Sequence, residues 1–261
     1  MNMPKLPLDE WIETAVDFLY DNLEWLFDFL STVIDGMVEG LAFVLQLPPA
    51  FAVIVLFGLL GYWLGKWPLA IFSLIGLLLI ENLGYWDNTM DTLALVLTSS
   101  IISILVGIPV GILCAQRDRV QQMVTPVLDF MQTMPAFVYL IPAVTFFGLG
   151  VVPGVIASVI FAVPPTIRLT NLGIRQVPAD LVEAADAFGS TPRQKLLKVQ
   201  LPLALPSIMA GINQTIMLSL SMVVIASMIG AQGLGADVYR AVTQIKIGQG
   251  FEAGLAIVIL A

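Results

Sequence analysis

Few residues in this chain could carry chemistry, and this excludes several classes of protein. The sequence has no histidine and one cysteine, Cys114, so it has no histidine-based catalytic or metal site and no internal disulfide. It contains no G-x-x-x-x-G-K-[ST] loop, so we do not expect it to bind ATP itself. A dense group of charges lies in the stretch EAADAFGSTPRQKLLKVQLP, residues 183–202, which includes Arg193, Lys195 and Lys198.

This charged stretch is predicted to form a helix, a break and a second helix. Its first six residues favour helix, and Gly189 suits the left-handed position that ends one. Ser190 or Thr191 can cap the next helix, with the following proline in its first turn. We expect the second helix to end near Leu201, because a proline disfavours helix at the residue before it.

The composition indicates a membrane protein. Hydrophobic residues make up 58% of the sequence, the mean hydropathy is +0.94, and the apolar runs suit helices that cross a bilayer. The sequence lacks the alternation of a barrel, and spanning helices satisfy their own backbone groups, so we predict an all-α membrane protein. Candidate spans lie at about 50–65, 68–83, 92–115, 136–149, 154–170 and 204–229, with a tight reversal at Gly65–Pro68.

Polar or glycine-rich stretches separate these spans. Residues 81–91 are interpreted as a polar loop, residues 120–134 as a partly amphipathic stretch, and the residues from 230 to Gly250 as a Gly-rich segment. A last apolar run begins near Phe251 and ends with the sequence at Ala261. Because this run is too short to cross a bilayer, we expect either a truncated chain or an end that does not span.

Residues 1–47 form a distinct N-terminal segment. The first 39 residues hold nine acidic residues and one base, Lys5, which together account for the net charge of −8. The acids recur every three or four residues opposite a row of aromatic and aliphatic residues, so we predict an amphipathic helix. It could lie in the membrane interface or pack against the flank of a bundle. We expect Asp35-Gly36 and Gly40 to loosen it, and its pattern is not that of a secretory leader.

The placement of basic residues predicts the orientation of the chain. With the N-terminus outside, eight of the eleven basic residues fall on the inner side, which agrees with the positive-inside rule. These residues are Lys66, Arg117, Arg119, Arg168, Arg175, Arg193, Lys195 and Lys198. The other three, Lys5, Arg240 and Lys246, fall on the outer side. The charged stretch 183–202 is therefore predicted to face the cytoplasm.

The spacing within residues 183–202 resembles the cytoplasmic signature loop of ABC importer permeases. That pattern is E-A-A, three residues, G, nine residues, and then a hydrophobic residue, any residue, and Leu-Pro. The matching positions are Glu183, Ala184, Ala185, Gly189, Leu201 and Pro202, and Val199 stands where the family usually has Ile. The resemblance implies that a coupling loop at 171–202 docks on an ATP-binding subunit, whereas an amphipathic surface hairpin is the alternative.

Longer stretches resemble the permeases of glycine betaine/proline betaine importers, which carry quaternary-ammonium osmolytes. These stretches are LGYWDNTMDTLALVLTS, TPVLDFMQTMPAFVYLIPAV, VVPGVIASVIFAVPPTIRLT and GINQTIMLSLSMVVIASMIG. The resemblance covers about residues 50–261 and implies a type I ABC importer transmembrane bundle at 48–261 in a bacterial cytoplasmic membrane. It also implies a second permease copy, two ATPase subunits that hold ATP and Mg²⁺, and an external or fused substrate-binding domain. No nucleic-acid partner is expected.

The residues alone do not identify the side chains that line the pore or contact the substrate. Polar residues of the last long span, Asn213, Gln214, Thr215, Ser219 and Ser221, could pack inside the bundle or contact a substrate. Aromatic residues that could hold a quaternary ammonium ion are Tyr139, Phe146, Phe147 and Phe161, but their spacing defines no cage. We therefore name no substrate ligands. An ATP-independent secondary transporter or channel is the main alternative, although Glu81 and Asp129, at span ends, offer no internal acid for ion coupling.

Overall fold

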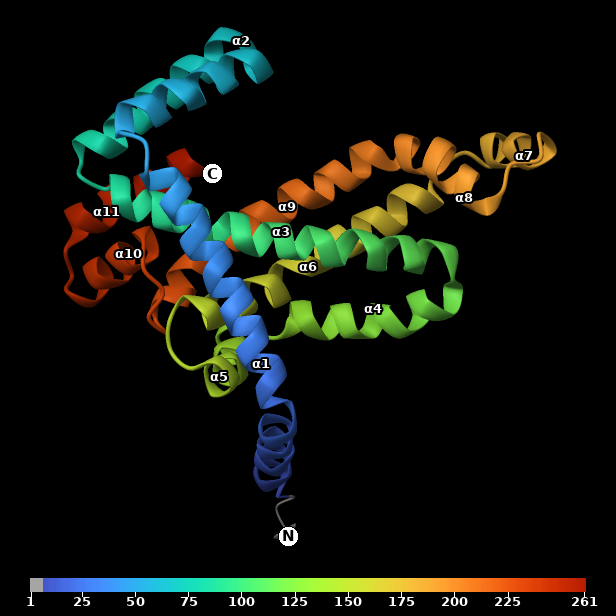
Figure 1. Cartoon of the computed structure of the whole chain (residues 1–261), viewed down its shortest axis with the longest axis horizontal. Helices are drawn as coiled ribbons and strands as arrows, with labels where there is room; N and C mark the ends of the chain where they lie inside the picture. The colour runs from blue at the N-terminus through green and yellow to red at the C-terminus, as the bar shows by residue number, and fades with distance from the viewer. Residues whose placement is uncertain (1–6) are drawn as a thin grey trace.

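Every regular element in the computed structural model, which describes residues 7–261, is a helix (Figure 1). Lys5, predicted to lie outside, falls beyond the described residues. The helices are α1 Leu8–Gln46, α2 Ala50–Asn82, α3 Trp86–Gln116, α4 Asp118–Thr133, α5 Ala136–Phe147, α6 Val151–Arg175, α7 Ala179–Ala187, α8 Pro192–Lys195, η1 Leu196–Gln200 (a π-helical segment), α9 Leu201–Ser227, α10 Leu234–Thr243 and α11 Ile247–Leu260. By length and composition, four helices in this part of the chain could cross a membrane, with α2 included only when its whole length is counted, or five if the bent pair of α4 and α5 is one span.

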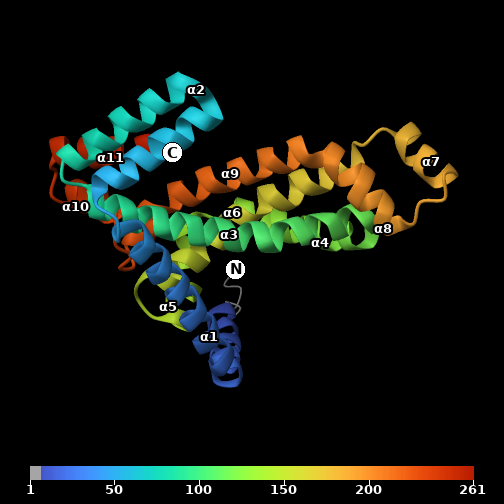
Figure 2. The same ribbon diagram turned by 45° about the horizontal axis from the view of Figure 1, so that its top comes forward.

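The centre of the bundle consists of α3, α6 and α9, which lie side by side in both views (Figures 1 and 2). Glycines allow these helices to approach closely, as is common in membrane bundles. A Cβ atom built on Gly111 of α3 would lie 2.6 Å from the Cβ atom of Thr170 on α6. Between α6 and α9, the hydroxyl of Thr166 lies 2.7 Å from that of Thr215, which donates to the carbonyl of Ala162 at 2.8 Å. This contact is therefore both tightly packed and internally hydrogen-bonded.

Helices α4 and α5 form the bent pair, with an angle of 101° between them. Pro135 directly precedes α5, and Met134 before it adopts extended backbone (φ −70°, ψ 135°), as a residue before proline prefers. The predicted span 136–149 is wrong in this respect, because α5 has 12 residues and reaches only about 18 Å. The bent pair is therefore either one broken crossing or a re-entrant loop.

Helix α2 is a hairpin, as the reversal at Gly65–Pro68 predicted. The backbone leaves the helical region at Gly65 (φ −130°) and at Lys66, which adopts the left-handed region (φ 57°). The arms pack closely because a Cβ atom on Gly61 would lie 3.2 Å from the backbone of Ala70. Each arm has roughly 15 residues, fewer than a full crossing needs, so the two predicted spans form one short hairpin.

Helix α1 is continuous, so the predicted loosening at Asp35-Gly36 and Gly40 is wrong. The helix persists there because its neighbouring residues Ile34 and Val38 are buried in the core cluster of α3, α6 and α9. Phe27 stacks on Phe146 of α5, with ring centroids 4.6 Å apart. The second half of α1 thus packs on the flank of the bundle. Aromatic residues nearer the N-terminus remain exposed, including Trp11, Phe18 and Trp25.

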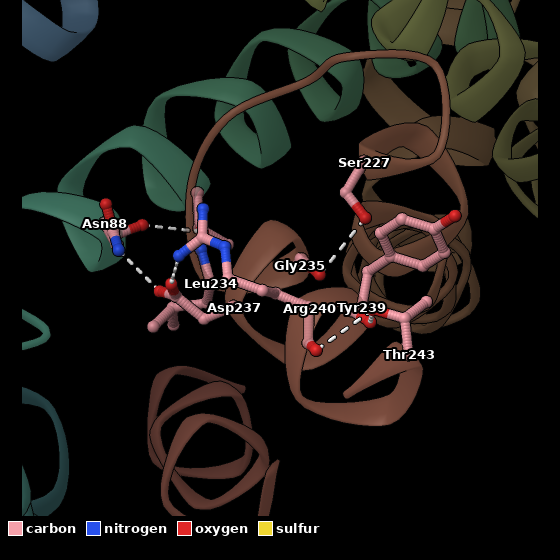
Figure 3. Close-up of polar contacts among 9 residues, drawn as sticks. Asn88, Ser227, Leu234, Gly235, Asp237, Tyr239, Arg240 and Thr243 are labelled. Atoms are coloured by element: carbon pink, nitrogen blue, oxygen red, sulfur yellow. Dashed lines mark hydrogen bonds and ion pairs between the residues drawn. The ribbon is translucent and has the colours of Figure 1, made fainter. Parts of the chain in front are cut away.

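Short helices close the end of the bundle opposite α7 and α8 (Figure 1). The interpretation of residues 81–91 as a loop is wrong, since α3 already begins at Trp86, and α10 and α11 occupy much of the predicted Gly-rich segment. Figure 3 shows why α10 is ordered: Asn88 of α3 donates to Asp237, and the Ser227 hydroxyl donates to the carbonyl of Gly235 at 3.1 Å. The amide of Leu234 also donates to Thr92 of α3 at 2.8 Å.

Candidate functional site: the loop between α6 and α9

The charged loop projects beyond the turn that joins α3 to α4, at one end of the bundle (Figures 1 and 2). Its base is fixed by Arg175, the last residue of α6. The Nη2 group of Arg175 donates to the carbonyl of Cys114 at 2.8 Å and forms an ion pair with Asp118 at 2.7 Å. Its Nε donates to Asn171 at 3.0 Å. The ends of α3, α4 and α6 are therefore tied together where the loop begins.

The turn after α7 confirms the predicted role of Gly189. This residue has φ +73°, a left-handed conformation that glycine adopts without penalty. The amide of Gly189 donates to the carbonyl of Asp186 at 2.9 Å, and the amide of Ser190 donates to that of Ala185 at 3.0 Å. These bonds satisfy carbonyl groups at the end of α7.

The start of α8 confirms the predicted cap. Thr191 accepts a hydrogen bond from the amide of Gln194 at 3.3 Å, and the Gln194 side chain accepts one from the amide of Thr191 at 2.9 Å. Pro192 occupies the first turn. Lys195 donates to both carboxylate oxygens of Asp186 at 2.8 Å and so joins α8 to α7 across the turn. The break between the helices is thus closed by local bonds and an ion pair.

The predicted end of the second helix near Leu201 is wrong. Helix α8 passes through η1 into α9, and Leu201, directly before the proline, keeps helical backbone angles. The amide of Leu201 donates to the carbonyl of Leu196, five residues earlier, which is the π-helical pattern. The wider π turn relieves the clash between a proline ring and the carbonyl four residues before it. Pro202 therefore lies in the first turn of α9 without ending the helix.

The residues of the signature pattern occupy three positions along the loop. Glu183 and Ala184 are exposed on α7, where Ala185 is half-buried. Gly189 lies at the tip, while Val199 and Leu201 are half-buried at the base, and Pro202 is exposed. Leu201 packs against a core cluster of α6 and α9 that contains Ile174, Ala204 and Ile208. The structure therefore places the two ends of the pattern apart, one on the projecting helix and one in the core.

Two features of the loop were not singled out from the sequence. Glu183 lines a hollow of about 350 Å³ together with Arg175, Gln200 and residues at the base of α7. Phe188, next to the turn, is 91% exposed. An aromatic residue inside a polar, charged stretch was the available signal, because aromatic residues are enriched where a partner protein docks.

The aromatic candidates for the pore serve mainly in packing. Tyr139 is buried and donates its hydroxyl to the carbonyl of Met131. Phe146 and Phe147 both contact Phe27 of α1. Phe161 lies at the edge of a cluster that contains Tyr139. These positions give no aromatic cage.

The polar candidates on α9 divide into two groups. Thr215 and Ser219 are fully buried, and Thr215 bonds to α6, so for it the packing interpretation is favoured. Asn213, Gln214 and Ser221 are exposed on the single chain.

Asp129 was predicted to lie at the end of a span, and this stays a prediction. It lies inside α4 and forms an ion pair of 2.6 Å with Arg168 of α6. Arg168 itself, counted among the basic residues of the inner side, lies within α6 and seven residues before its end. This ion pair between α4 and α6 was not predicted from the sequence.

The comparisons with known proteins agree with this architecture. The family described as "Binding-protein-dependent transport system inner membrane component" matches residues 107–261. The chain is 57% identical to the glycine betaine transport system permease protein OpuAB of Bacillus subtilis, over 99% of this chain and 92% of that protein. It is also 57% identical to the glycine betaine/carnitine transport permease protein GbuB of Listeria monocytogenes, over 100% and 93%.

A more distant relative and a solved structure extend the agreement. The glycine betaine/proline betaine permease protein ProW of Escherichia coli is 47% identical over 98% of this chain and 72% of its own. An inward-facing structure of the MetNI methionine ABC transporter matches with a TM-score of 0.62 at 23% identity, over 67% of this chain and 88% of that chain. At this identity the structural likeness shows the fold, which is that of an ABC importer membrane subunit.

The family assignment rests on matches that cover more than half of the chain and most of its relatives. Members of this family are multi-pass inner-membrane components that depend on a binding protein, and their ATPase is a separate subunit. The chain belongs to the inner-membrane permease family of binding-protein-dependent ABC transport systems, together with the glycine betaine permeases.

Proposed function

We propose that this permease moves glycine betaine and related quaternary-ammonium osmolytes into the cell, by alternating access driven by ATP hydrolysis on a partner subunit. The observation that carries the proposal is 57% identity, over nearly the whole chain, with two permeases named for glycine betaine transport. A third relative is named for glycine betaine and proline betaine. The shared chemistry of these solutes is a quaternary ammonium group.

The working assembly is proposed to contain two copies of this permease, two ATPase subunits and an external or fused substrate-binding domain. The dependence on a binding protein and on a separate ATPase follows from the family. The N-terminus is proposed to lie outside, with residues 1–47 as a segment distinct from the permease domain at 48–261. The grouping of Arg117, Arg119 and Arg175 with the basic residues of α8 at one end of the bundle supports this orientation.

The loop at 171–202 is proposed to be the contact with the ATPase. A coupling element must be stiff, and this one is closed by the turn at Gly189, the cap at Thr191 and the ion pair between Lys195 and Asp186. The exposed residues that would meet the partner include Glu183, Ala184 and Phe188, whereas Ala185, Gly189, Val199, Leu201 and Pro202 would set the shape of the loop.

A comparison of two variants tests the coupling role. Glu183→Lys and Asp180→Lys make the same charge change on exposed positions of the same helix, but only Glu183 lines the hollow at the base of the loop. We expect Glu183→Lys to abolish uptake into vesicles that contain the complete transporter, and Asp180→Lys to retain most of it. Permease abundance and co-purification of the ATPase serve as controls. Equal uptake by both variants would contradict the assignment.

Two further measurements test the transport function itself. Uptake of labelled glycine betaine by wild-type vesicles should require ATP and the ATPase subunit, and uptake without them would instead support a secondary transporter or channel. Competition by unlabelled glycine betaine, proline betaine, carnitine and choline would then rank the substrates. Failure of all four to compete would refute the proposed substrate class.

A further inference from the structure

Helix α4 carries a continuous polar stripe. Apart from Arg119 in the first turn, its polar side chains fall, at 100° per residue, within about one third of the helix circumference. They are Asp118, Gln121, Gln122, Thr125, Asp129, Gln132 and Thr133. All of these are exposed on the chain except Gln121, which is half-buried. The stripe runs the whole length of α4, from its first residue to its last.

Beyond Arg119, the other faces of α4 are apolar. Val120, Val124, Leu128 and Met131 pack into a cluster with α3 and α6. A third stripe, Met123, Val127 and Phe130, is apolar and exposed, with Val127 at 55%. The helix therefore has a face toward the bundle, a face suited to lipid and a face suited to water.

The centre of the polar stripe holds opposite charges. Arg168 Nη2 lies 2.6 Å from Asp129 Oδ1, with the side chains 41% and 58% exposed. Within the described residues, the buried Nε of Arg168 has no hydrogen-bond acceptor. Arg168 precedes the end of α6 by seven residues and Asp129 follows the start of α4 by eleven, which are distances of about 10 Å and about 16 Å along the two helices. Where the pair of α4 and α5 crosses the bilayer, these charges are costly against lipid, so we expect them to face water or a polar partner.

We propose that the polar stripe of α4 lines the aqueous translocation pathway, and that the Asp129–Arg168 pair is a subsite for a zwitterionic solute. The substrate class in this inference rests on the proposed function, whereas the pathway does not. A betaine has a carboxylate that accepts from a guanidinium and a quaternary ammonium group that a carboxylate attracts.

The ion pair suits weak, transient binding of a solute better than tight binding. The two charges already neutralise each other, so a zwitterion that inserts between them exchanges one pair of contacts for two of the same kind. Such an exchange leaves little net charge on the pathway at any stage. It also discriminates against simple anions and cations, each of which would leave one member of the pair without a partner.

Thiol labelling tests whether the stripe faces water. Cys114 is buried and is the sole cysteine, so Cys114→Ala gives a cysteine-free background. Thr125→Cys lies on the polar stripe and Val127→Cys on the exposed apolar stripe, only two residues away. In vesicles with the assembled transporter, we expect a charged, membrane-impermeant thiol reagent to label position 125 and not position 127. If neither position is labelled, or if both are labelled equally, the polar stripe of α4 does not line the aqueous pathway.

Reversal of the ion pair tests the subsite. The double variant Asp129→Arg/Arg168→Asp keeps opposite charges on α4 and α6 but exchanges their places. We expect glycine betaine uptake to fall about tenfold or more, the size of one lost charge-assisted hydrogen bond, while the ATPase still co-purifies. Uptake equal to wild type would show that the pair only joins the helices. If wild-type vesicles take up no betaine, the proposed function is wrong. The thiol labelling then still shows whether the polar stripe of α4 faces water.

Discussion

The turn at Gly189 allows a graded test of how far coupling depends on backbone conformation. Gly189 is held at φ +73°, and a Cβ atom built there meets no heavy atom within 4 Å. A substitution therefore causes no steric clash within the chain, and its effect comes from the left-handed conformation alone. For alanine this conformation costs about 1–2 kcal/mol, and the cost is smaller for asparagine and larger for a β-branched residue.

These costs translate into occupancy of the native turn. A penalty of about 1–2 kcal/mol lowers the ratio of native to altered turn by a factor of about 5–30. If the partner ATPase engages only the native turn, uptake should fall in the order Gly189, Asn, Ala, Val. The measurement is ATP-dependent uptake by vesicles with equal amounts of each variant, with ATPase activity recorded in parallel.

Two results would refute this reasoning. Normal uptake by Gly189→Val would show that the left-handed turn is not required. An equal loss of uptake in Gly189→Asn and Gly189→Val would show that any side chain at this position blocks the partner. Steric contact with the ATPase, and not the backbone conformation, would then determine the loss of uptake.

Three other predictions follow from contacts within the bundle and the loop. Gly111→Ala should lower the free energy of unfolding by about 1–3 kcal/mol, because its Cβ atom would overlap Thr170. Gly36→Ala has open space around its Cβ atom and should raise the free energy of unfolding by up to about 1 kcal/mol. Thermal unfolding of the detergent-purified transporter measures both, and equal shifts of the melting temperature would contradict the prediction. Pro202→Ala restores an amide and removes the ring clash, so η1 should become α-helical, and uptake should fall while the permease stays folded; unchanged uptake would count against a role for the π turn. Lys195→Asp should lower ATP-dependent uptake, and the additional change Asp186→Lys should restore part of that uptake, although such a surface pair contributes only about 0.2–1 kcal/mol. If the double variant shows no recovery of uptake, the ion pair has no role in coupling.

Features governed by neighbouring residues could be predicted from the sequence. The left-handed Gly189 and the cap at Thr191 depend on four or five residues of local chain, and both are found as expected. The reversal at Gly65–Lys66 is of the same kind. In each case one backbone conformation satisfies local hydrogen bonds or sterics, so no distant contact is needed to choose it.

Predictions failed where packing outweighed a local preference. Pro202 was expected to end a helix, but a π turn accommodates it within one continuous helix. Gly36 was expected to loosen α1, yet the burial of Ile34 and Val38 keeps the helix intact. At Gly36 the free energy of packing exceeds the cost that the isolated helix would suffer, whereas at Pro202 a wider backbone turn removes the conflict.

The candidate subsite was missed for a different reason. Asp129 and Arg168 are 39 residues apart, and only the packing of α4 on α6 brings them together. A signal was nevertheless present, because the polar residues of α4 recur at intervals of three and four. Such a row on a helix flanked by apolar spans indicates a water-facing side even before any partner is known.

The glycines between α3, α6 and α9 also limit how this subunit can move. Where one backbone lies directly against a neighbouring side chain, as at Gly111 and Thr170, sliding by even part of a turn would drive atoms into each other. We therefore expect these three helices to move as a single block during a transport cycle. Opening and closing must then take place at the joints around that block: between one permease copy and the next, or at the bend between α4 and α5.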